Sequence, residues 1–246
     1  MELLVLFGSQ SDQHIFGPLL AQLAQADFSS ELKILSAHRN PQELERALSE
    51  KAFDVVIAGA GLAAHLPGAV ASRTSKPVIG IPVSANLGGF DAFLSIVQMP
   101  YGVPVLTSRV DEIKTVIHVL EKIRQMKRPQ FNLVFDLREC EAVGPEVERC
   151  VAFLKEQKLD EALSVGECVK EEAINLSFVS LASSLGRIIK NENAIVINVP
   201  VLADKEKRDP QMGMRFFQQA ESLGDLWVGI NNGRNAILAI QNFFRR

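Results

Sequence analysis

The segment AGAGLAAHLPG, residues 58–68, decides how this chain is expected to fold. It follows the apolar run DVVI, residues 54–57, whose β-branched side chains are typical of a buried strand. Its glycines let the backbone approach a small ligand closely, because they carry no Cβ. Pro67 suits the first turn of a helix predicted over residues 66–73. A strand, a Gly/Ala loop and a helix that begins beside His65 together predict a ligand cradle. A buried structural turn without a ligand is the alternative.

A polar loop, GSQSD at residues 8–12, follows an earlier apolar strand predicted over residues 3–7. Apolar residues then recur at helical spacing over residues 15–23. Ser9, Ser11 and Asp12 are therefore expected near a helix N-terminus, where free N–H groups favour a phosphate. The alternative is that Asp12 only caps the helix.

The segment SAHRNP, residues 36–41, follows a strand predicted over residues 32–35 and precedes a helix predicted over residues 43–52. His38 and Arg39 thus lie at the same sheet edge as Ser9, and that edge binds ligands in open α/β sheets. The planar guanidinium of Arg39 suits a phosphate, and a histidine titrates near neutral pH and can carry a proton. The alternative makes His38 a helix cap and Arg39 a surface charge.

The remaining pattern predicts a doubly wound parallel α/β sheet that occurs twice. In the first half, strands are expected at residues 78–83 and 103–107, with helices at 91–97 and 110–126. After residues 127–129 the pattern restarts, with strands at 133–135, 174–181, 194–201 and 226–230 and helices at 143–159, 216–223 and 236–244. Corresponding strands and helices of the two halves lie at a nearly constant distance along the chain, about 120 residues. This spacing indicates a tandem duplication, with one domain at residues 1–128 and a second at 129–246.

The second copy lacks the polar motifs of the first. DLRE at residues 136–139 replaces the GSQSD loop, and residues 180–184, SLASS, replace the Gly/Ala cradle. No His-Arg pair follows its second strand. The second domain is therefore predicted to be a degenerate copy without a site that completes an assembly, and an unrelated regulatory domain is the alternative.

Composition excludes several classes of function. A net charge of −3 gives no reason to expect nucleic acid or an anionic membrane as partner. His65 and Pro67 argue against a membrane span in the uncharged run over residues 55–72. A secreted protein has a charged segment and an apolar core before its first strand, and this pattern is not seen here, so secretion is not expected. Three cysteines without metal-ligand spacing predict reduced, buried or half-buried thiols, a cytoplasmic location and no metal site.

Four segments together resemble the PurE family, the N5-carboxyaminoimidazole ribonucleotide mutases of purine biosynthesis. They are GSQSD (8–12), SAHRNP (36–41), AGAGLAAHLPG (58–68) and SIVQMPYGVPV (95–105), in the family's order and spacing. The resemblance covers residues 3 to 107. Two departures stand out. The family's Ser-Ala-Leu-Ser-Gly loop is SANLG here, at residues 84–88, and its closing Asn-rich segment appears only at residues 231–236.

The resemblance implies a three-layer parallel α/β fold, no metal and no organic cofactor, and an octamer of single domains, for which a fused pair forms a homotetramer. It implies that Ser9, Asp12 and Arg39 bind the ribose phosphate with Ser11 beside them, that His38 is the catalytic proton carrier and that His65 lies near the migrating carboxylate. The predicted substrate-binding residues are Ser9, Ser11, Asp12, Ser36, Arg39, Gly59, Ala60, Gly61, His65 and Leu66.

The expected activity is the isomerisation of a small ribonucleotide, N5-carboxyaminoimidazole ribonucleotide, to its 4-carboxy isomer. A related carboxylase acting on aminoimidazole ribonucleotide or on a pyridinium nucleotide is an alternative, and a nucleotide-binding module without catalysis is another. The intact histidine and polar loop favour an enzyme. The Asn-rich tail over residues 231–235 is expected to reach a neighbouring site.

Overall fold

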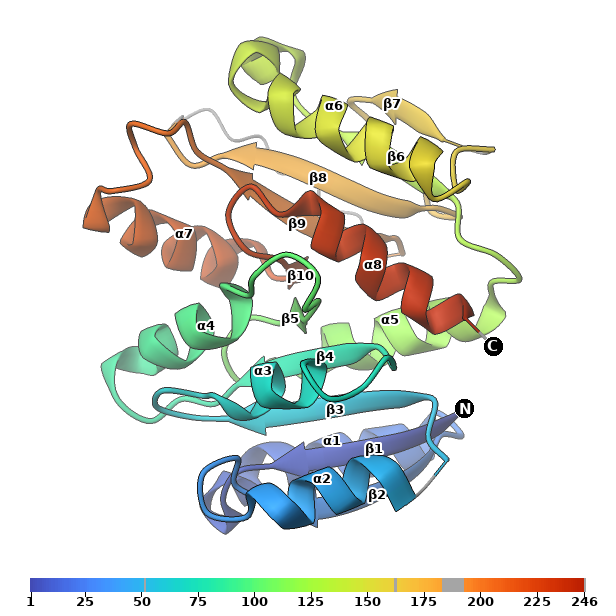
Figure 1. The fold of residues 1–246 in the computed structure, drawn as a ribbon, viewed down its shortest axis with the longest axis vertical. Coiled ribbons are helices and arrows are strands. Elements are labelled where there is room, and N and C mark those ends of the chain that lie inside the picture. The colour runs from blue at the N-terminus through green and yellow to red at the C-terminus, as the bar shows by residue number, and fades with distance from the viewer. Residues whose placement is uncertain (51, 162, 183–192, 246) are drawn as a thin grey trace.

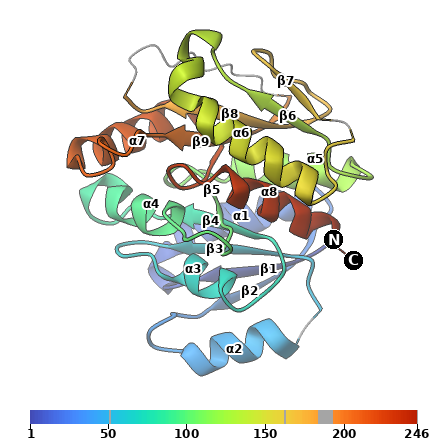
Figure 2. The ribbon, with the colours of Figure 1, turned by 45° about the horizontal axis from the view of Figure 1, so that its top comes forward.

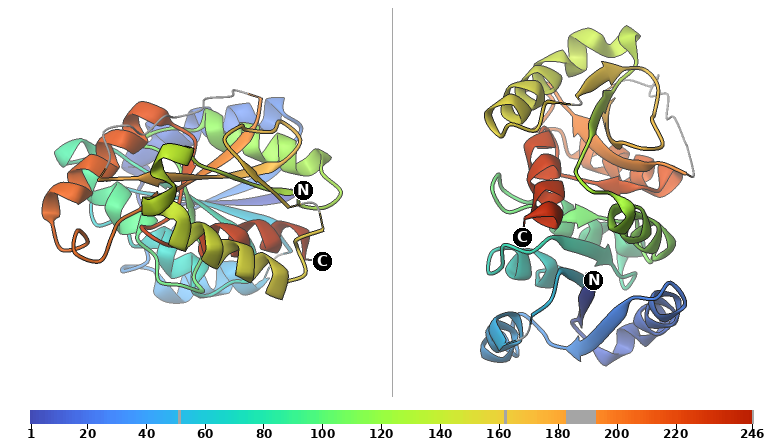
Figure 3. Two further views of the ribbon diagram at one scale, coloured as in Figure 1. Left: turned by 90° about the horizontal axis from the view of Figure 1, so that it is seen from above. Right: turned by 90° about the vertical axis from the view of Figure 1, so that its right-hand side faces the viewer.

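The computed structural model describes residues 1–50, 52–161, 163–182 and 193–245. Their ten strands form one mostly parallel sheet with the order β2-β1-β3-β4-β5-β10-β9-β8-β6-β7. Helices cover both faces of the sheet, which is seen edge-on from above in Figure 3. The chain is thus a layered α/β structure, as the sequence predicts.

The first half supplies five strands and five α-helices. The strands are β1 (Glu2–Phe7), β2 (Ser29–Ile34), β3 (Val55–Ala60), β4 (Val78–Pro82) and β5 (Leu106–Thr107). The helices are α1 (Gln13–Gln25), α2 (Pro41–Glu50), α3 (Leu66–Ala71), α4 (Phe90–Val97) and α5 (Lys114–Gln125). Short 3₁₀ turns, η1 (Gln10–Asp12) and η2 (Leu87–Gly89), precede α1 and α4.

The pleat of β1 explains why helices cover both faces of the first half. Leu4 and Leu6 lie in one cluster with side chains of α2 and α3, whereas Val5 and Phe7 pack with α1 and α5. Alternate side chains of a strand point to opposite faces. A strand that is apolar at successive positions therefore has to be covered on both sides.

Over its described residues, the second half supplies five more strands and three α-helices. The strands are β6 (Phe131–Val134), β7 (Ser164–Gly166), β8 (Ile174–Ser180), β9 (Ile195–Val201) and β10 (Leu226–Trp227). The helices are α6 (Cys140–Glu156), α7 (Pro210–Leu223) and α8 (Gly233–Phe244), with a 3₁₀ turn η3 (Leu137–Glu139) before α6. In Figure 1, α6 and α8 lie in front of the sheet.

The two halves have the same strand order and join at their centre. Numbered within its own half, each reads 2-1-3-4-5, and the last strands β5 and β10 meet through an antiparallel pair between Thr107 and Trp227. Helices α4 and α7 lie side by side at this join (Figure 2). There the rings of Phe93 and Phe216 are 5.2 Å apart in a T-shaped contact, which buries both against Trp227. One continuous core thus spans both halves.

Several expectations need correction in detail. Strand β7 was not predicted, because its three residues carry no apolar run and Val165 is exposed. Helix α5 begins at Lys114 and not at residue 110, since Asp111 has a φ of +57° and Glu112 accepts a hydrogen bond from the Lys114 amide. Residue 51 of the predicted helix 43–52, and Ser183 and Ser184 of the segment over residues 180–184, lie outside the described residues.

The thiols differ from expectation as well. Cys150 is buried, as predicted, but Cys140 and Cys168 are exposed. Within the described part of the chain, no helix has both the length and the apolar character needed to cross a membrane.

Candidate active site

A cavity of about 430 Å³ opens at the carboxyl ends of β1, β2 and β3. Because these strands are parallel and adjacent, the loops that follow them meet at one edge of the sheet. Of the residues singled out from the sequence, the cavity is lined by Ser9, Ser11, Asp12, Ser36, His38, Arg39, Ala60, Gly61, His65 and Leu66. Residues as far apart in the chain as Ser9 and Leu66 thus form one site.

Two histidines face each other in this cavity. The Nδ1 atom of His65 lies 2.9 Å from the Nε2 atom of His38. Their rings are nearly perpendicular, at 86°, with centroids 4.9 Å apart. In such a contact one ring nitrogen donates the hydrogen bond and the other accepts it. Both side chains are exposed, so a ligand in the cavity can reach them.

The loop after β1 forms a chain of hydroxyl and carboxyl groups. Ser9 caps η1, since its Oγ accepts from the Ser11 amide at 3.2 Å. The Ser11 hydroxyl lies 2.8 Å from the Ser9 hydroxyl and 3.1 Å from Oδ1 of Asp12. Asp12 makes no side-chain cap hydrogen bond with α1, which removes the alternative that it serves only as a cap.

The Asp12 carboxyl is only 7% exposed, although it sits at the wall of a cavity. Burial raises its pKa above the ordinary value, because a charged group loses hydration there. The hydroxyl of Ser11 and the charge of His14 oppose this rise only in part. A buried carboxyl at a cavity wall fits a hydrogen-bonding partner for ligand hydroxyls.

Arg39 connects the loops that follow β1 and β2. Its Nη2 atom donates to the Gly8 carbonyl at 3.0 Å. The Ser36 hydroxyl accepts from the amides of His38 and Arg39, both at 3.3 Å, and so fixes the turn that carries them. Both residues have exposed side chains and line the cavity.

Close packing requires glycine at two positions of the Gly/Ala cradle. A Cβ on Gly59 would lie 2.1 Å from the ring of Phe7, so that position has no space for a side chain. A Cβ on Gly61 would lie 3.1 Å from the Val83 carbonyl. Gly59 does not line the cavity; it lies beneath it, at the end of β3. The role of Gly59 is therefore in packing, not in ligand contact.

Sequence reasoning missed several cavity residues, all small or apolar. They are Gly8, Ala37, Leu62, Ala63, Ala64 and Ala85. Leu62 has a φ of +56° and an exposed side chain, in a conformation that leucine rarely adopts. Ala85 belongs to the loop over residues 84–89, and Ser84 connects this loop to the Asp111 carboxylate through two hydrogen bonds.

The matching loop of the second half carries different chemistry. Asp136 caps η3 as Ser9 caps η1, since its Oδ1 accepts from the Arg138 amide at 2.9 Å. The Arg138 guanidinium, however, is bound by the Asp136 carboxylate itself. Glu139 is buried where Asp12 lies in the first half, at the third residue of its 3₁₀ turn. The backbone is thus alike in both loops and the side chains are not.

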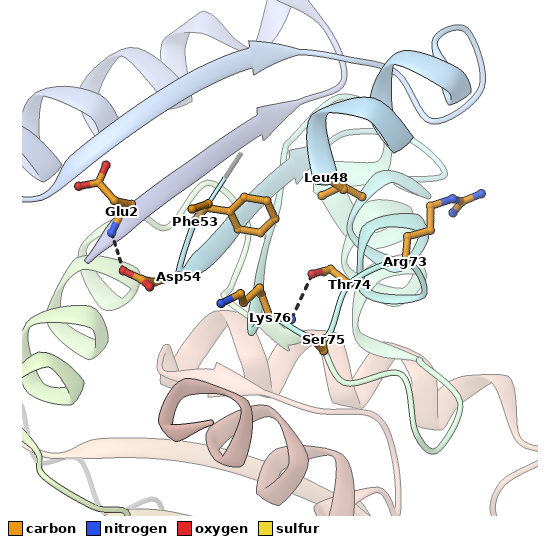
Figure 4. A pocket seen from close by; sticks show the side chains of 9 residues that line it. Glu2, Leu48, Phe53, Asp54, Arg73, Thr74, Ser75 and Lys76 are labelled. Atoms are coloured by element: carbon orange, nitrogen blue, oxygen red, sulfur yellow. Dashed lines mark hydrogen bonds between the residues drawn. The ribbon is translucent and has the colours of Figure 1, made fainter. Parts of the chain in front are cut away.

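A second hollow, of about 410 Å³, lies at the opposite edge of the first half (Figure 4). Its polar groups bond within the wall: the Glu2 amide donates to Asp54 at 2.8 Å and the Lys76 amide to Thr74 at 3.1 Å. The described residues that line it include no histidine. Among the described residues, no three His, Cys, Asp or Glu side chains gather as metal ligands would.

Comparison with known proteins places these motifs in one family. The family described as AIR carboxylase matches residues 2–133. A protein of Mycobacterium tuberculosis (strain CDC 1551 / Oshkosh), named N5-carboxyaminoimidazole ribonucleotide mutase, is 50% identical over 107 residues, which are 42% of this chain and 62% of that protein. Proteins of the same name from Methanocaldococcus jannaschii and Pyrococcus abyssi are 49% and 41% identical, over 44% and 51% of this chain and 68% and 75% of their own length.

The match spans less than two thirds of the Mycobacterium tuberculosis relative, and it lies in the first half of this chain. Among solved structures, Treponema denticola PurE is 20% identical with a TM-score of 0.45, over 65% of this chain and 98% of that one. The family match covers more than half of the 246 residues and all the loops that form the cavity. This chain therefore belongs to the AIR carboxylase family.

Proposed function

We propose that this protein isomerises N5-carboxyaminoimidazole ribonucleotide to 4-carboxy-5-aminoimidazole ribonucleotide, a step of purine biosynthesis. One observation carries the proposal: a hydrogen-bonded histidine pair faces the same cavity as Arg39 and the loop of Ser9, Ser11 and Asp12. That arrangement offers proton carriers beside groups suited to a ribose phosphate. Three relatives with the mutase name share the matched segment.

In the proposed reaction the bond between the exocyclic nitrogen and its carboxylate breaks and releases CO₂. His38, in its protonated form, donates a proton to that nitrogen as the bond breaks. The ring carbon C4 is then electron-rich and attacks CO₂ to form the new carbon–carbon bond. The proton that leaves C4 returns to His38, so that substrate and product are isomers and the histidine is regenerated.

His65 is proposed to act through its contact with His38. Its Nδ1 lies 2.9 Å from Nε2 of His38. This hydrogen bond would fix the orientation of the His38 ring and its tautomer. The Gly/Ala wall made by residues 60–64 would hold CO₂ close to C4 in a site with little water. Arg39 retains guanidinium N–H groups beyond the one that binds Gly8, and these are available for the phosphate.

The test uses substrate whose carboxylate carries ¹³C, incubated with the protein and an excess of unlabelled bicarbonate but without ATP. We expect the 4-carboxy product to form and to retain the label. Product that forms only with added bicarbonate, and without label, would support the direct carboxylase instead. Tight binding of the nucleotide with no turnover would support the non-catalytic module.

We further propose that residues 129–246 are a degenerate second copy and that four chains form the assembly. The equal strand order of the two halves supports a duplication, and the side-chain replacements after β6 support a loss of the site. A tetramer is a common closed symmetric assembly. Light scattering should give a mass four times the 27.0 kDa of one chain, and a stable monomer would refute this part. The cytoplasmic location stays a prediction.

A further inference from the structure

The loop over residues 98–103, which links α4 to β5, is held by side chains from the far end of the chain. Nδ2 of Asn232 donates to the Met99 carbonyl at 2.9 Å. Asn235 makes three such bonds: Nδ2 donates to the Pro100 carbonyl at 2.9 Å and to the Val103 carbonyl at 3.4 Å, and Oδ1 accepts from the Gly102 amide at 3.0 Å. These partners are at least 132 residues apart in sequence. Figure 1 shows the start of α8 beside this loop.

The same segment also contacts the side chains of the loop. The Ile230 amide donates to Oε1 of Gln98 at 3.3 Å, and the Arg234 guanidinium stacks 4.0 Å from the centre of the Tyr101 ring. Ile230, Asn232, Arg234 and Asn235 therefore contact the loop along its length. Within this chain the tail binds the loop over residues 98–103, and its expected reach to a neighbouring site stays a prediction.

The start of α8 is itself fixed by the second half. Glu146 of α6 is 2% exposed, and its Oε1 accepts from the Gly233 amide at 2.9 Å. This carboxylate supplies the cap that the Asn232 side chain does not, since Asn232 makes no side-chain cap hydrogen bond to α8. The asparagines are thus presented to the loop from a rigid support.

On its other side the loop contacts α3, the helix that begins directly after His65 of the candidate active site. Met99 packs into the cluster that contains Leu66 of α3. Its Sδ and Cε atoms lie 3.0 Å from the position that a Cβ on Gly68 would take. Gly68 is in the first turn of α3, which begins directly after His65, and the His65 carbonyl accepts from the Ala69 amide at 2.9 Å. A shift of Met99 would therefore move the helix that carries His65.

We propose that Asn232 and Asn235 are positioning residues for the His38–His65 pair. They fix the loop over residues 98–103, Met99 fixes α3, and α3 sets where His65 meets His38. The second half would then serve the reaction through α8 although its own loop carries different side chains. The kinetic part of this inference rests on the proposed function, whereas the geometric part does not.

The test compares Asn235→Asp with Asn231→Asp. Each substitution keeps an acceptor oxygen and removes the Nδ2 donor. Asn231 is the matched control because, among the described residues, its side-chain amide bonds only Leu202 of the second half, with the Leu202 amide and carbonyl both at 2.8 Å. Met99→Ala is a second variant that leaves every asparagine in place, in case Asn235→Asp does not fold.

The first readout is the ring-nitrogen NMR signals of the histidines at one pH, which needs no substrate. The chain has four histidines, so His14 and His118 serve as internal references. We expect Asn235→Asp and Met99→Ala to move the signals of His38 and His65 only, and Asn231→Asp to move none. Unmoved His38 and His65 signals in a folded Asn235→Asp or Met99→Ala protein would overturn the proposal.

The second readout is turnover per folded molecule. We expect kcat to fall about tenfold or more in Asn235→Asp with KM changed far less, because small misplacements of reacting groups cost rate more than binding. Asn231→Asp should retain its kcat. Equal losses in both asparagine variants would mean a structural role only and would overturn the proposal. An inactive wild-type protein would refute the proposed function, and the NMR result would still decide the positioning role.

Discussion

Nε2 of His38 and Nδ1 of His65 lie 2.9 Å apart, although the two residues are 27 positions apart in sequence and follow different strands. A hydrogen bond between two imidazole nitrogens needs one donor and one acceptor, so the contact holds a single proton. The tautomer of each ring consequently depends on the other. A substitution of one histidine is therefore expected to change the tautomer of the other.

Replacing His38 by asparagine should abolish turnover and leave nucleotide binding nearly intact. An amide cannot carry a proton between nitrogen and carbon, and such groups contribute about 10²-fold or more to rate. The variant His118→Asn is the control, since His118 lies outside the cavity. Activity of His38→Asn within about tenfold of wild type would remove His38 from the proton-transfer role.

Arg39→Ala should weaken binding of the phosphorylated nucleotide far more than binding of its dephosphorylated analogue. The guanidinium suits a phosphate, and under the proposed function the sugar and base would contact other residues of the cavity. Calorimetry with both ligands measures the difference, and Arg46→Ala on α2 controls for the loss of a positive charge. Equal weakening for both ligands would show that Arg39 does not bind the phosphate.

Asp12→Asn should raise stability at neutral pH while it weakens nucleotide binding. Burial raises the pKa of this carboxyl above 3.8, so its ionised form is disfavoured in the folded protein. The contribution of Asp12 to stability is thus most favourable below pH 3.8 and falls as pH rises through the folded pKa. The variant lacks this fall. The melting temperatures of wild type and Asp12→Asn, measured against pH, should separate as the pH rises above 3.8, with the variant the more stable. Parallel curves would contradict a raised pKa for Asp12.

Native thiol titration should detect two of the three cysteines. Cys140 and Cys168 are exposed, whereas Cys150 is buried beside the Glu146 carboxyl. Burial strongly raises the pKa of the Cys150 thiol, which suppresses the reactive thiolate. The third thiol should appear only on unfolding. Reaction of Cys150 at the rate of the other two in native protein would show that α6 and α8 separate in solution.

Residues 1–128 alone should aggregate or lose most activity. Phe93 and Val97 are 0% and 1% exposed because α7 and Trp227 cover them, and removal of the second half would expose both. The truncation would also remove Asn232 and Asn235 from the loop over residues 98–103. Solubility and sedimentation test this. A cooperative, fully active product would make the second half dispensable.

The sequence by itself determined the local units of this protein and the edge at which its site forms. Apolar runs such as residues 54–57 specify buried strands, and the loops GSQSD and SAHRNP follow two of them directly. In a parallel sheet these loops meet at one edge, so the grouping of Ser9, His38 and His65 could be predicted without coordinates.

Only the tertiary structure decided contacts between distant segments. The three-residue edge strand β7 depends on pairing with β6, and the late start of α5 depends on Glu112 and on Asp111 in a left-handed conformation. The bond between Asn235 and Gly102 spans 133 residues. Such features arise from packing between halves, because local propensity contributes little where one or two residues must meet a partner far along the chain.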